Sequence, residues 1–333
     1  MIKFSEYFSC WVHEEYYAKG VKIGREGDFY TSVSVGYLFG AALANYFIRL
    51  ISKSHLETDC AVVEIGANDG AMMADFIQGV YTLAPELLKS VRFIIVEPHE
   101  KLISMQKQTF SERFGEEVFV EWVRDLDELR LDEAFVISNE LFDSFACELI
   151  NGDEMAFFDE NRGIIWDKAL PKISTAASSA GVLKGEFSPI YREFARKLSR
   201  AVDSGRFISF DYGEWAHRGD FSLRIYKNHD VFNFFEVENL DEFFGTCDIT
   251  YDVCFSYLAQ CFASEGWRMS SYKTQASALL GECAVTELVE IIQKRGGENA
   301  AKNALKQLKY LTMPSFLGER FKFIEFVTGV ESC

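Results

Sequence analysis

Residues 61–70, which read AVVEIGANDG, join a short apolar run that contains Glu64 to a loop with two glycines. A buried strand that turns sharply into a helix leaves backbone N–H groups unpaired at the turn, and glycine lets a ligand approach them closely. A second apolar run, residues 93–96, is followed by Glu97. A carboxylate at the tip of the second strand suits the two hydroxyls of a ribose. The loop and the acid together predict a site for a nucleoside-containing cofactor.

The spacing of the glycines indicates which cofactor to expect. A dinucleotide loop requires G-x-G-x-x-G, and Gly66 and Gly70 do not follow that pattern. The loop resembles the E/D-x-G-x-G-x-G loop of class I S-adenosylmethionine methyltransferases, with Asn68 in place of the middle glycine. The sulfonium and ammonium groups of S-adenosylmethionine are cationic, so Glu64 and Asp69 suit them. A nicotinamide oxidoreductase is a weaker alternative, and so is a tight turn in another α/β protein.

A second group of polar residues follows the apolar run 134–138. Asn139, Glu140 and Asp143 come at its end, and in open α/β sheets ligands bind beyond the carboxyl ends of the strands. We expect these residues to face the same crevice as Glu64 and Glu97. Two carboxylates can hold a guanidinium in bidentate fashion, so methyl transfer onto an arginine would suit them. The alternative is a helix N-cap at Asn139.

The rest of the chain alternates strand and helix patterns. This rhythm predicts a Rossmann-like parallel sheet with helices on both faces. The expected strands are residues 61–65, 93–97, 118–122, 134–138, 207–212 and 321–327, and the expected helices are 71–83, 100–114, 126–130, 189–202 and 284–311, the last broken at Gly296 and Gly297.

The predicted organisation places a helical N-terminal cap or lid at residues 1–55. The methyltransferase-like domain follows in two parts, 56–150 and 200–333. Between them, residues 151–199 form an insertion, with a hairpin of residues 155–158 and 163–166 and then a helix. The cap contains the sequence GDFYT, in which Asp28 and Thr31 could contact the cofactor as part of a lid; a plain turn between helices is equally compatible with it.

The amino-acid composition limits the classes of binding partner to expect. The chain has 333 residues, 48% hydrophobic and 26% charged, with a formal net charge of −17. Such an acidic balance argues against nucleic acid as the main partner. The most apolar stretch, residues 37–51, is interrupted by Asn45 and Arg49 and is too short to span a bilayer. A cytoplasmic location is the default expectation, and a homodimer stays open.

Eight cysteines are scattered without C-x-x-C spacing. Cys247, Cys254 and Cys261 recur every seven residues, which predicts that they share one helical face. Packing is the expected role of that face, and no metal site is predicted, because no histidine lies nearby.

Several segments, in order along the chain, resemble the MidA-type class I methyltransferases, a family that includes the mitochondrial complex I assembly factor that methylates arginine. The matching motifs lie at residues 27–32 (GDFYTS), 63–70 (VEIGANDG), 96–98 (VEP), 139–144 (NELFDS), 186–189 (EFSP), 210–213 (FDYG), 222–226 (SLRIY), 274–275 (TQ), 313–314 (MP) and 317–322 (LGERFK).

This resemblance implies an S-adenosylmethionine-dependent enzyme that methylates an arginine of a partner protein, such as a respiratory-complex subunit, by direct SN2 transfer. It implies that Glu64, Gly66 and Glu97 contact the cofactor and that Asn139, Glu140 and Asp143 face the acceptor. Asn68 and Gly70 belong to the same cofactor loop.

The chain departs from the family pattern at residues 248–255, which read DITYDVCF where the family tends to have D-L-T-x-H-V-D-F. The histidine and the second aspartate are lost. With Asn68, this departure motivates an alternative, a catalytically weak methyltransferase-like factor that binds and assembles a respiratory or other protein complex. Arg224, in the SLRIY motif, is expected to form a buried ion pair with an acid at the strand ends.

Overall fold

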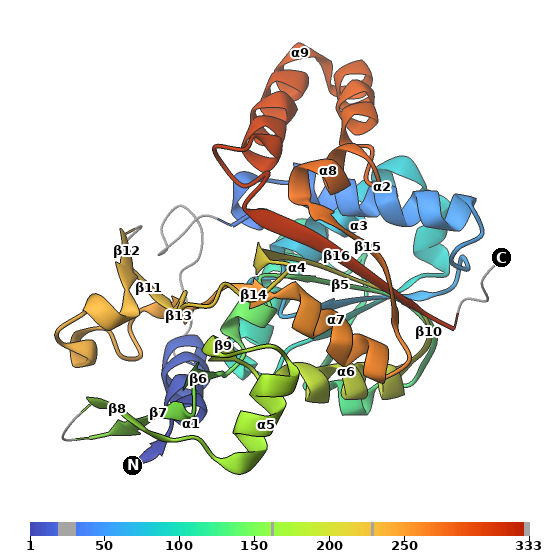
Figure 1. Ribbon diagram of the computed structural model, residues 1–333. Helices are drawn as coiled ribbons and strands as arrows, with labels where there is room; N and C mark the ends of the chain where they lie inside the picture. Colours follow the sequence, from blue (N-terminus) through green and yellow to red (C-terminus); the bar gives the residue numbers. More distant parts are fainter. Residues whose placement is uncertain (19–30, 161–162, 228–229, 330–333) are drawn as a thin grey trace. The chain divides into compact units, whose positions relative to one another are not determined.

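The structure is a computed structural model that describes residues 1–18, 31–160, 163–227 and 230–329 (Figure 1). The chain forms two compact units. Unit 1 comprises residues 1–30, 140–196 and 212–265, and unit 2 comprises residues 31–139, 197–211 and 266–333. The helix α6 (Ile190–Ala201) and the strand β10 (Val202–Glu214) each contain residues of both units.

Unit 2 is built on a mostly parallel sheet with the strand order β15-β16-β10-β5-β2-β3-β4. The neighbours β10–β5, β5–β2, β2–β3 and β3–β4 are parallel, and β15 is antiparallel to β16. Its strands are β2 (Ala61–Ile65), β3 (Arg92–Val96), β4 (Val120–Val123), β5 (Leu131–Asn139), β15 (Arg268–Thr274) and β16 (Phe321–Thr328). Its helices are η2 (Val33–Val35), α2 (Leu38–Ser52), α3 (Ala71–Leu83), η3 (Pro85–Lys89), α4 (Glu100–Phe114), η4 (Leu126–Glu128), α8 (Gln275–Leu280) and α9 (Val285–Thr312).

The apolar runs of the sequence form the central strands of this sheet. Parallel strands are buried on both faces, so they need apolar residues at almost every position. All five residues of β2 are buried, and alternate residues of the strands, such as Val62, Phe135 and Ile137, join one core with α2 and α3. This packing places the carboxyl ends of β2 and β3, and the loops that follow them, at one edge of the sheet.

Small residues let α2 and α3 approach each other closely. A Cβ atom added at Gly79 would lie 2.8 Å from the Cβ atom of Ala44 and 3.1 Å from the Cα atom of Ala41. On the facing helix, a Cβ atom at Gly40 would lie 2.8 Å from the carbonyl oxygen of Met72. Both helices therefore lack room for a side chain at their glycine contacts.

The helix α9 consists of two helical arms that fold back on each other (Figure 1). Gly297 separates them, with φ of +75° and ψ of −172°. This is the break that Gly296 and Gly297 predict from the sequence.

Unit 1 contains two antiparallel sheets. One has the order β1-β7-β6-β9 with β8 paired to β7, and the other has the order β12-β11-β13. Its strands are β1 (Ile2–Lys3), β6 (Glu148–Asn151), β7 (Glu154–Asp159), β8 (Gly163–Lys168), β9 (Lys184–Phe187), β11 (Arg224–Lys227), β12 (Asp230–Asn233), β13 (Asp248–Thr250) and β14 (Val253–Cys254). Its helices are α1 (Phe4–Ser9), the π-helix η1 (Cys10–Tyr17), η5 (Phe142–Ser144), α5 (Pro171–Ser179), η6 (Phe234–Glu236), η7 (Leu240–Glu242) and α7 (Phe255–Ser264).

The alternation of strands and helices predicted from the sequence is confirmed, with ends that shift by up to five residues, and β7 and β8 form the expected hairpin. The short helix predicted at residues 126–130 is a single 3-10 turn, and the sheet predicted to be parallel ends in the antiparallel pair β15–β16. The division into a cap, a methyltransferase domain and an insertion stays a prediction. Across the described ranges, no helix combines the length and the apolar character needed to cross a membrane.

The prediction of one helical face for the three cysteines is wrong. Cys247 precedes β13, Cys254 lies in β14, and only Cys261 lies in a helix, α7. All three are buried, but each lies in a different local structure, so their seven-residue spacing does not mark one helix.

The close approach of α2 and α3 generates a stability prediction. Gly79→Val should lower the free energy of unfolding by roughly 1–3 kcal/mol, because the new side chain overpacks against Ala41 and Ala44. Gln78→Val introduces the same residue at an exposed position of α3 and should cost about 0.5 kcal/mol. Urea unfolding of both variants measures the difference; equal stability would contradict the packing argument.

Candidate functional site

The loop after β2 contains three residues with positive φ in its short turn. The φ angles are +73° at Gly66, +47° at Asn68 and +80° at Gly70. The N–H of Gly66 donates to the carbonyl oxygen of Val96 at 3.2 Å, which ties the loop to the end of β3. Asparagine tolerates the left-handed region better than other residues with a Cβ atom. Asn68 therefore keeps a left-handed backbone where the family pattern has glycine.

Glu64, near the end of β2, is 2% exposed. Burial raises the pKa of its carboxyl to about 8, and the nearby charge of Asp69 adds to the shift, while a backbone hydrogen bond from Met73 opposes it. Its Oε2 atom has no hydrogen-bond partner within the described ranges. A buried, partnerless carboxylate oxygen is costly unless a ligand supplies a cation or a donor.

Glu97 follows β3 and is also 2% exposed. Burial raises the pKa of its carboxyl to about 7, and hydrogen bonds from His99 and Gln106 oppose the rise. The N–H of His99 donates to Oε1 at 3.0 Å. The carboxyl group is thus held at the strand end, where the sequence predicts a contact with ribose hydroxyls.

Gln106 was not among the residues predicted from the sequence, although it contacts two of them. It lies on α4 and is fully buried. Its Nε2 atom donates to the carbonyl oxygen of Asn68 at 2.9 Å and to Oε2 of Glu97 at 3.4 Å. A polar residue among the buried Leu102, Ile103 and Phe110 of α4 is the sequence signal that could have indicated it.

Of the two lid residues predicted to contact the cofactor, the structure describes Thr31. It lies in a turn that is held by local hydrogen bonds. The N–H of Thr31 donates to Oγ of Ser34 at 2.9 Å, and the N–H of Ser34 donates to Oγ1 of Thr31 at 3.1 Å. Ser32 donates to the buried Gln275 at 2.8 Å, so the family T-Q motif anchors this turn. Asp28 lies outside the described residues.

In unit 1, Asp143 is 3% exposed. Burial raises the pKa of its carboxyl to about 6, while a hydrogen bond from Tyr212 and the charge of Arg224 act in the opposite direction. Its Oδ1 atom has no hydrogen-bond partner in the part of the chain that the structure describes. Glu140 has φ of +52°, a strained conformation for glutamate that is concentrated at functional sites.

Tyr17, at the end of η1, is affected by the charge of a third carboxylate besides Glu140 and Asp143. Burial raises the pKa of its hydroxyl well above the usual range, and the charges of Asp248, Asp143 and Glu140 raise it further. Asp248 begins β13 and is 1% exposed. The charges of Asp143, Glu140 and Asp248 thus all act on one tyrosine, and Asp248 is a carboxylate that the sequence-based predictions did not include.

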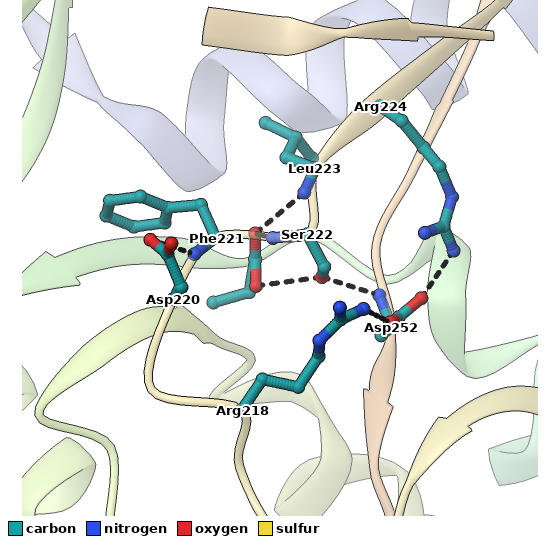
Figure 2. A network of polar contacts seen from close by, with 8 residues as sticks. Arg218, Asp220, Phe221, Ser222, Leu223, Arg224 and Asp252 are labelled. Atoms are coloured by element: carbon teal, nitrogen blue, oxygen red, sulfur yellow. Dashed lines mark hydrogen bonds and ion pairs between the residues drawn. The ribbon is translucent and has the colours of Figure 1, made fainter.

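Arg224 forms an ion pair, as expected, but its partner is Asp252, which lies between β13 and β14 in the segment that departs from the family pattern, and the pair is only partly buried (Figure 2). The Nη2 atom of Arg224 lies 2.5 Å from Oδ1 of Asp252, and both side chains are 12% exposed. Arg218, which is 56% exposed, pairs with the other oxygen of the same carboxylate. The Arg224 guanidinium also lies 4.7 Å from the ring centroid of Tyr212. Asp252 occupies the position of the family histidine.

Glu186, from the EFSP motif, fixes the chain before Arg224. Its Oε1 atom accepts hydrogen bonds from the N–H groups of Ser222 and Leu223 at 2.7 and 2.9 Å. The Ser222 hydroxyl in turn accepts a hydrogen bond from the N–H of Asp252 at 2.8 Å. The EFSP motif and the segment of residues 248–255 therefore both contact the SLRIY segment and position it.

The predicted site residues fall into two groups. Glu64, Gly66, Asn68, Gly70 and Glu97 lie together in unit 2, where Asn139 ends β5 next to β10. Glu140 and Asp143 lie in unit 1. That the two groups face one crevice stays a prediction, and so do the individual roles of these residues.

Comparison with known proteins identifies the family of this chain. Residues 42–273 match the family described as "Putative S-adenosyl-L-methionine-dependent methyltransferase". The chain is 24% identical to the bovine (Bos taurus) protein named "Protein arginine methyltransferase NDUFAF7, mitochondrial", over 94% of this chain and 76% of that protein. The human (Homo sapiens) protein of the same name is 23% identical over 92% and 75%.

A solved structure has the same fold. It is a protein from Burkholderia thailandensis bound to S-adenosyl-homocysteine, with a TM-score of 0.83 and 23% identity, covering all of this chain and 89% of that one. The predicted α/β class I methyltransferase fold is therefore confirmed. The expected cytoplasmic location is contradicted, because the curated relatives are named as mitochondrial proteins.

The two arginines that share Asp252 allow a matched stability test. Arg224→Met should lower the free energy of unfolding by about 3–5 kcal/mol, because it leaves a buried carboxylate with one cation fewer. Arg218→Met removes an exposed partner of the same carboxylate and should cost less than about 1 kcal/mol. Chemical denaturation measures both variants. An equal loss for the two would show that burial does not decide the strength of this network.

Proposed function

We infer that this chain, which belongs to the family of S-adenosyl-L-methionine-dependent methyltransferases that its residues 42–273 match, transfers a methyl group to an arginine side chain of a partner protein. The observation that carries the proposal is the family match together with two buried carboxyl groups, each of which has one oxygen without a hydrogen-bond partner among the described residues. Glu64 is one and Asp143 is the other. Each would accept a cationic group, the first from the cofactor and the second from the acceptor.

The residues of unit 2 fit S-adenosylmethionine by their chemistry. The buried Oε2 atom of Glu64 lacks a donor from the described chain, and the carboxyl of Glu97 would hold the ribose hydroxyls. Gly66, Asn68 and Gly70 would bring the loop backbone close to the cofactor, and Thr31 and Asp28 would complete the site. When bound, S-adenosylmethionine supplies an electrophilic methyl group on a positively charged sulfur.

Unit 1 offers the groups that an arginine acceptor needs. An arginine side chain has a pKa near ~13.8, so full deprotonation at pH 7 would cost roughly 9 kcal/mol. Glu140 and Asp143 would bind the guanidinium and accept its proton as the new N–C bond forms. With a pKa of about 6, the carboxyl of Asp143 is mostly ionised at neutral pH and can accept that proton.

The proposal that the methyl acceptor is an arginine of a protein rests on the names of the related proteins. Two of them bear the name protein arginine methyltransferase, and the resemblance noted above suggests a respiratory-complex subunit as the acceptor. The net charge of −17 favours a basic partner segment over an acidic one. A homodimer is compatible with this proposal and is tested by light scattering.

The raised pKa values of the cofactor acids predict that binding depends on pH. Glu64 and Glu97 titrate near pH 8 and 7, and a cationic ligand favours their ionised forms. Affinity for S-adenosylmethionine should therefore rise between pH 6 and 8, by up to about tenfold per pH unit for each proton released.

Isothermal titration in buffers of different ionisation enthalpy counts the released protons. Glu64→Gln should bind more weakly and release fewer protons, whereas Glu86→Gln, the same change at an exposed position, should behave like the wild type. Binding that is independent of pH would refute the role of these acids.

The proposed acceptor acids predict a separate loss of methyl transfer. Asp143→Asn and Glu140→Gln should each lower the rate of arginine methylation by about 10²-fold or more, since they remove a proton acceptor. Cofactor affinity should stay unchanged. The assay incubates the protein and methyl-labelled S-adenosylmethionine with extract of source cells that lack the gene, and then measures methylarginine after hydrolysis.

Asp241→Asn, at an exposed position of the same unit, is the control for the acid variants. A wild-type protein that binds cofactor but labels no protein would favour the alternative of an assembly factor without catalysis. Full activity of both acid variants would exclude these carboxylates from the reaction.

A further inference from the structure

Gln106 connects the two parts of the cofactor site that are far apart in the sequence. Its amide N–H groups reach the carbonyl oxygen of Asn68 and Oε2 of Glu97, at 2.9 and 3.4 Å. The first atom belongs to the loop after β2, and the second to the end of β3. One buried side chain thus contacts the loop and the acid at the same time.

The orientation of this amide is fixed by Trp122 on β4. The indole Nε1–H of Trp122 donates to Oε1 of Gln106 at 3.1 Å. An indole can only donate, and the Asn68 carbonyl and an ionised Glu97 can only accept. A flipped amide would therefore place donor against donor at Trp122 and oxygen against oxygen at the other two contacts. The three neighbours accept only one orientation.

The loop backbone also packs directly on α4 at this residue. A Cβ atom added at Gly70 would lie 3.1 Å from a ring carbon of Phe110 and 3.4 Å from the Cα atom of Gln106. The Phe110 ring meets the Trp122 ring edge-on, with 5.9 Å between the centroids. The position of α4 and the amide contacts therefore restrain the same loop.

We propose that Gln106 is a positioning residue that holds the Asn68 loop and Glu97 in their binding arrangement before the cofactor arrives. It acts through those two residues and needs no contact with the cofactor. This inference rests on the proposed function, because the ligand in question is S-adenosylmethionine or its product. Preorganisation raises affinity by reducing the ordering that binding requires.

The test measures the dissociation constant of S-adenosylhomocysteine for the full chain by isothermal titration. Gln106→Met keeps the length of the side chain and removes its hydrogen bonds, and it should weaken binding about tenfold or more. Trp122→Phe leaves the amide free to rotate and should weaken binding about threefold. Lys107→Met, at an exposed residue of α4 that lies over the Trp122 ring, should leave the constant unchanged.

A pH profile separates positioning from a general effect on folding. In Gln106→Glu, an ionised carboxylate would face Glu97 and the Asn68 carbonyl at pH 8, so binding should be weaker than in Gln106→Met. At pH 6 the protonated acid can donate again, and its affinity relative to the wild type should recover. Gln106→Met should show no such recovery. If Gln106→Met fails to fold, the two pH values of Gln106→Glu supply the result.

The outcomes distinguish this inference from the proposed function. A wild-type protein that does not bind S-adenosylhomocysteine overturns both. A wild-type protein that binds it, with Gln106→Met binding equally well, overturns the positioning role alone. Loss of affinity in Gln106→Met with recovery of Gln106→Glu at pH 6 supports the role.

Discussion

Burial of carboxyl groups at the ends of the central strands is the constraint on which the proposed cofactor site depends. Glu64 and Glu97 are each 2% exposed, and no ion pair of the described residues includes either of them. Transfer of an uncompensated charge into a protein interior is strongly unfavourable, so such groups shift their pKa or acquire a partner. Both effects are consistent with a site that becomes fully ionised only when a cationic ligand binds.

Two other carboxylates that lie largely out of solvent are compensated, in contrast to Glu64. Oε1 of Glu325 accepts hydrogen bonds from Tyr46 at 2.5 Å and Arg206 at 3.0 Å, and Oε2 accepts one from Ser270. The carboxylate of Asp252 is shared by two arginines. The fold can supply partners for buried acids where they serve structure. Among the described residues, Oε2 of Glu64 and Oδ1 of Asp143 lack such a partner, and both residues belong to the proposed sites.

The sequence predicted features that depend on local pattern and on strand order. The loop around Gly66 and the acid Glu97 each follow an apolar run, so the rule for strand ends placed them without a structure. The pairing of Arg224 with Asp252 required contact between distant segments, and no local pattern encodes its geometry. The seven-residue recurrence of the cysteines failed because it is typical of a helix, while the chain forms the strands β13 and β14 up to Cys254 and the helix α7 begins only at Phe255.

Asn68 shows why a departure from a family motif need not abolish the site. Glycine is favoured in such loops because it adopts positive φ without strain, and Asn68 adopts φ of +47°. Asparagine is among the few other residues that visit this region routinely, so the backbone conformation of the loop is retained. The substitution also adds a side-chain oxygen, Oδ1, that is buried and has no hydrogen-bond partner among the residues described. Because an unpartnered buried acceptor is unfavourable, this oxygen gives the loop a further group that a bound donor, such as an ammonium or a hydroxyl, would satisfy.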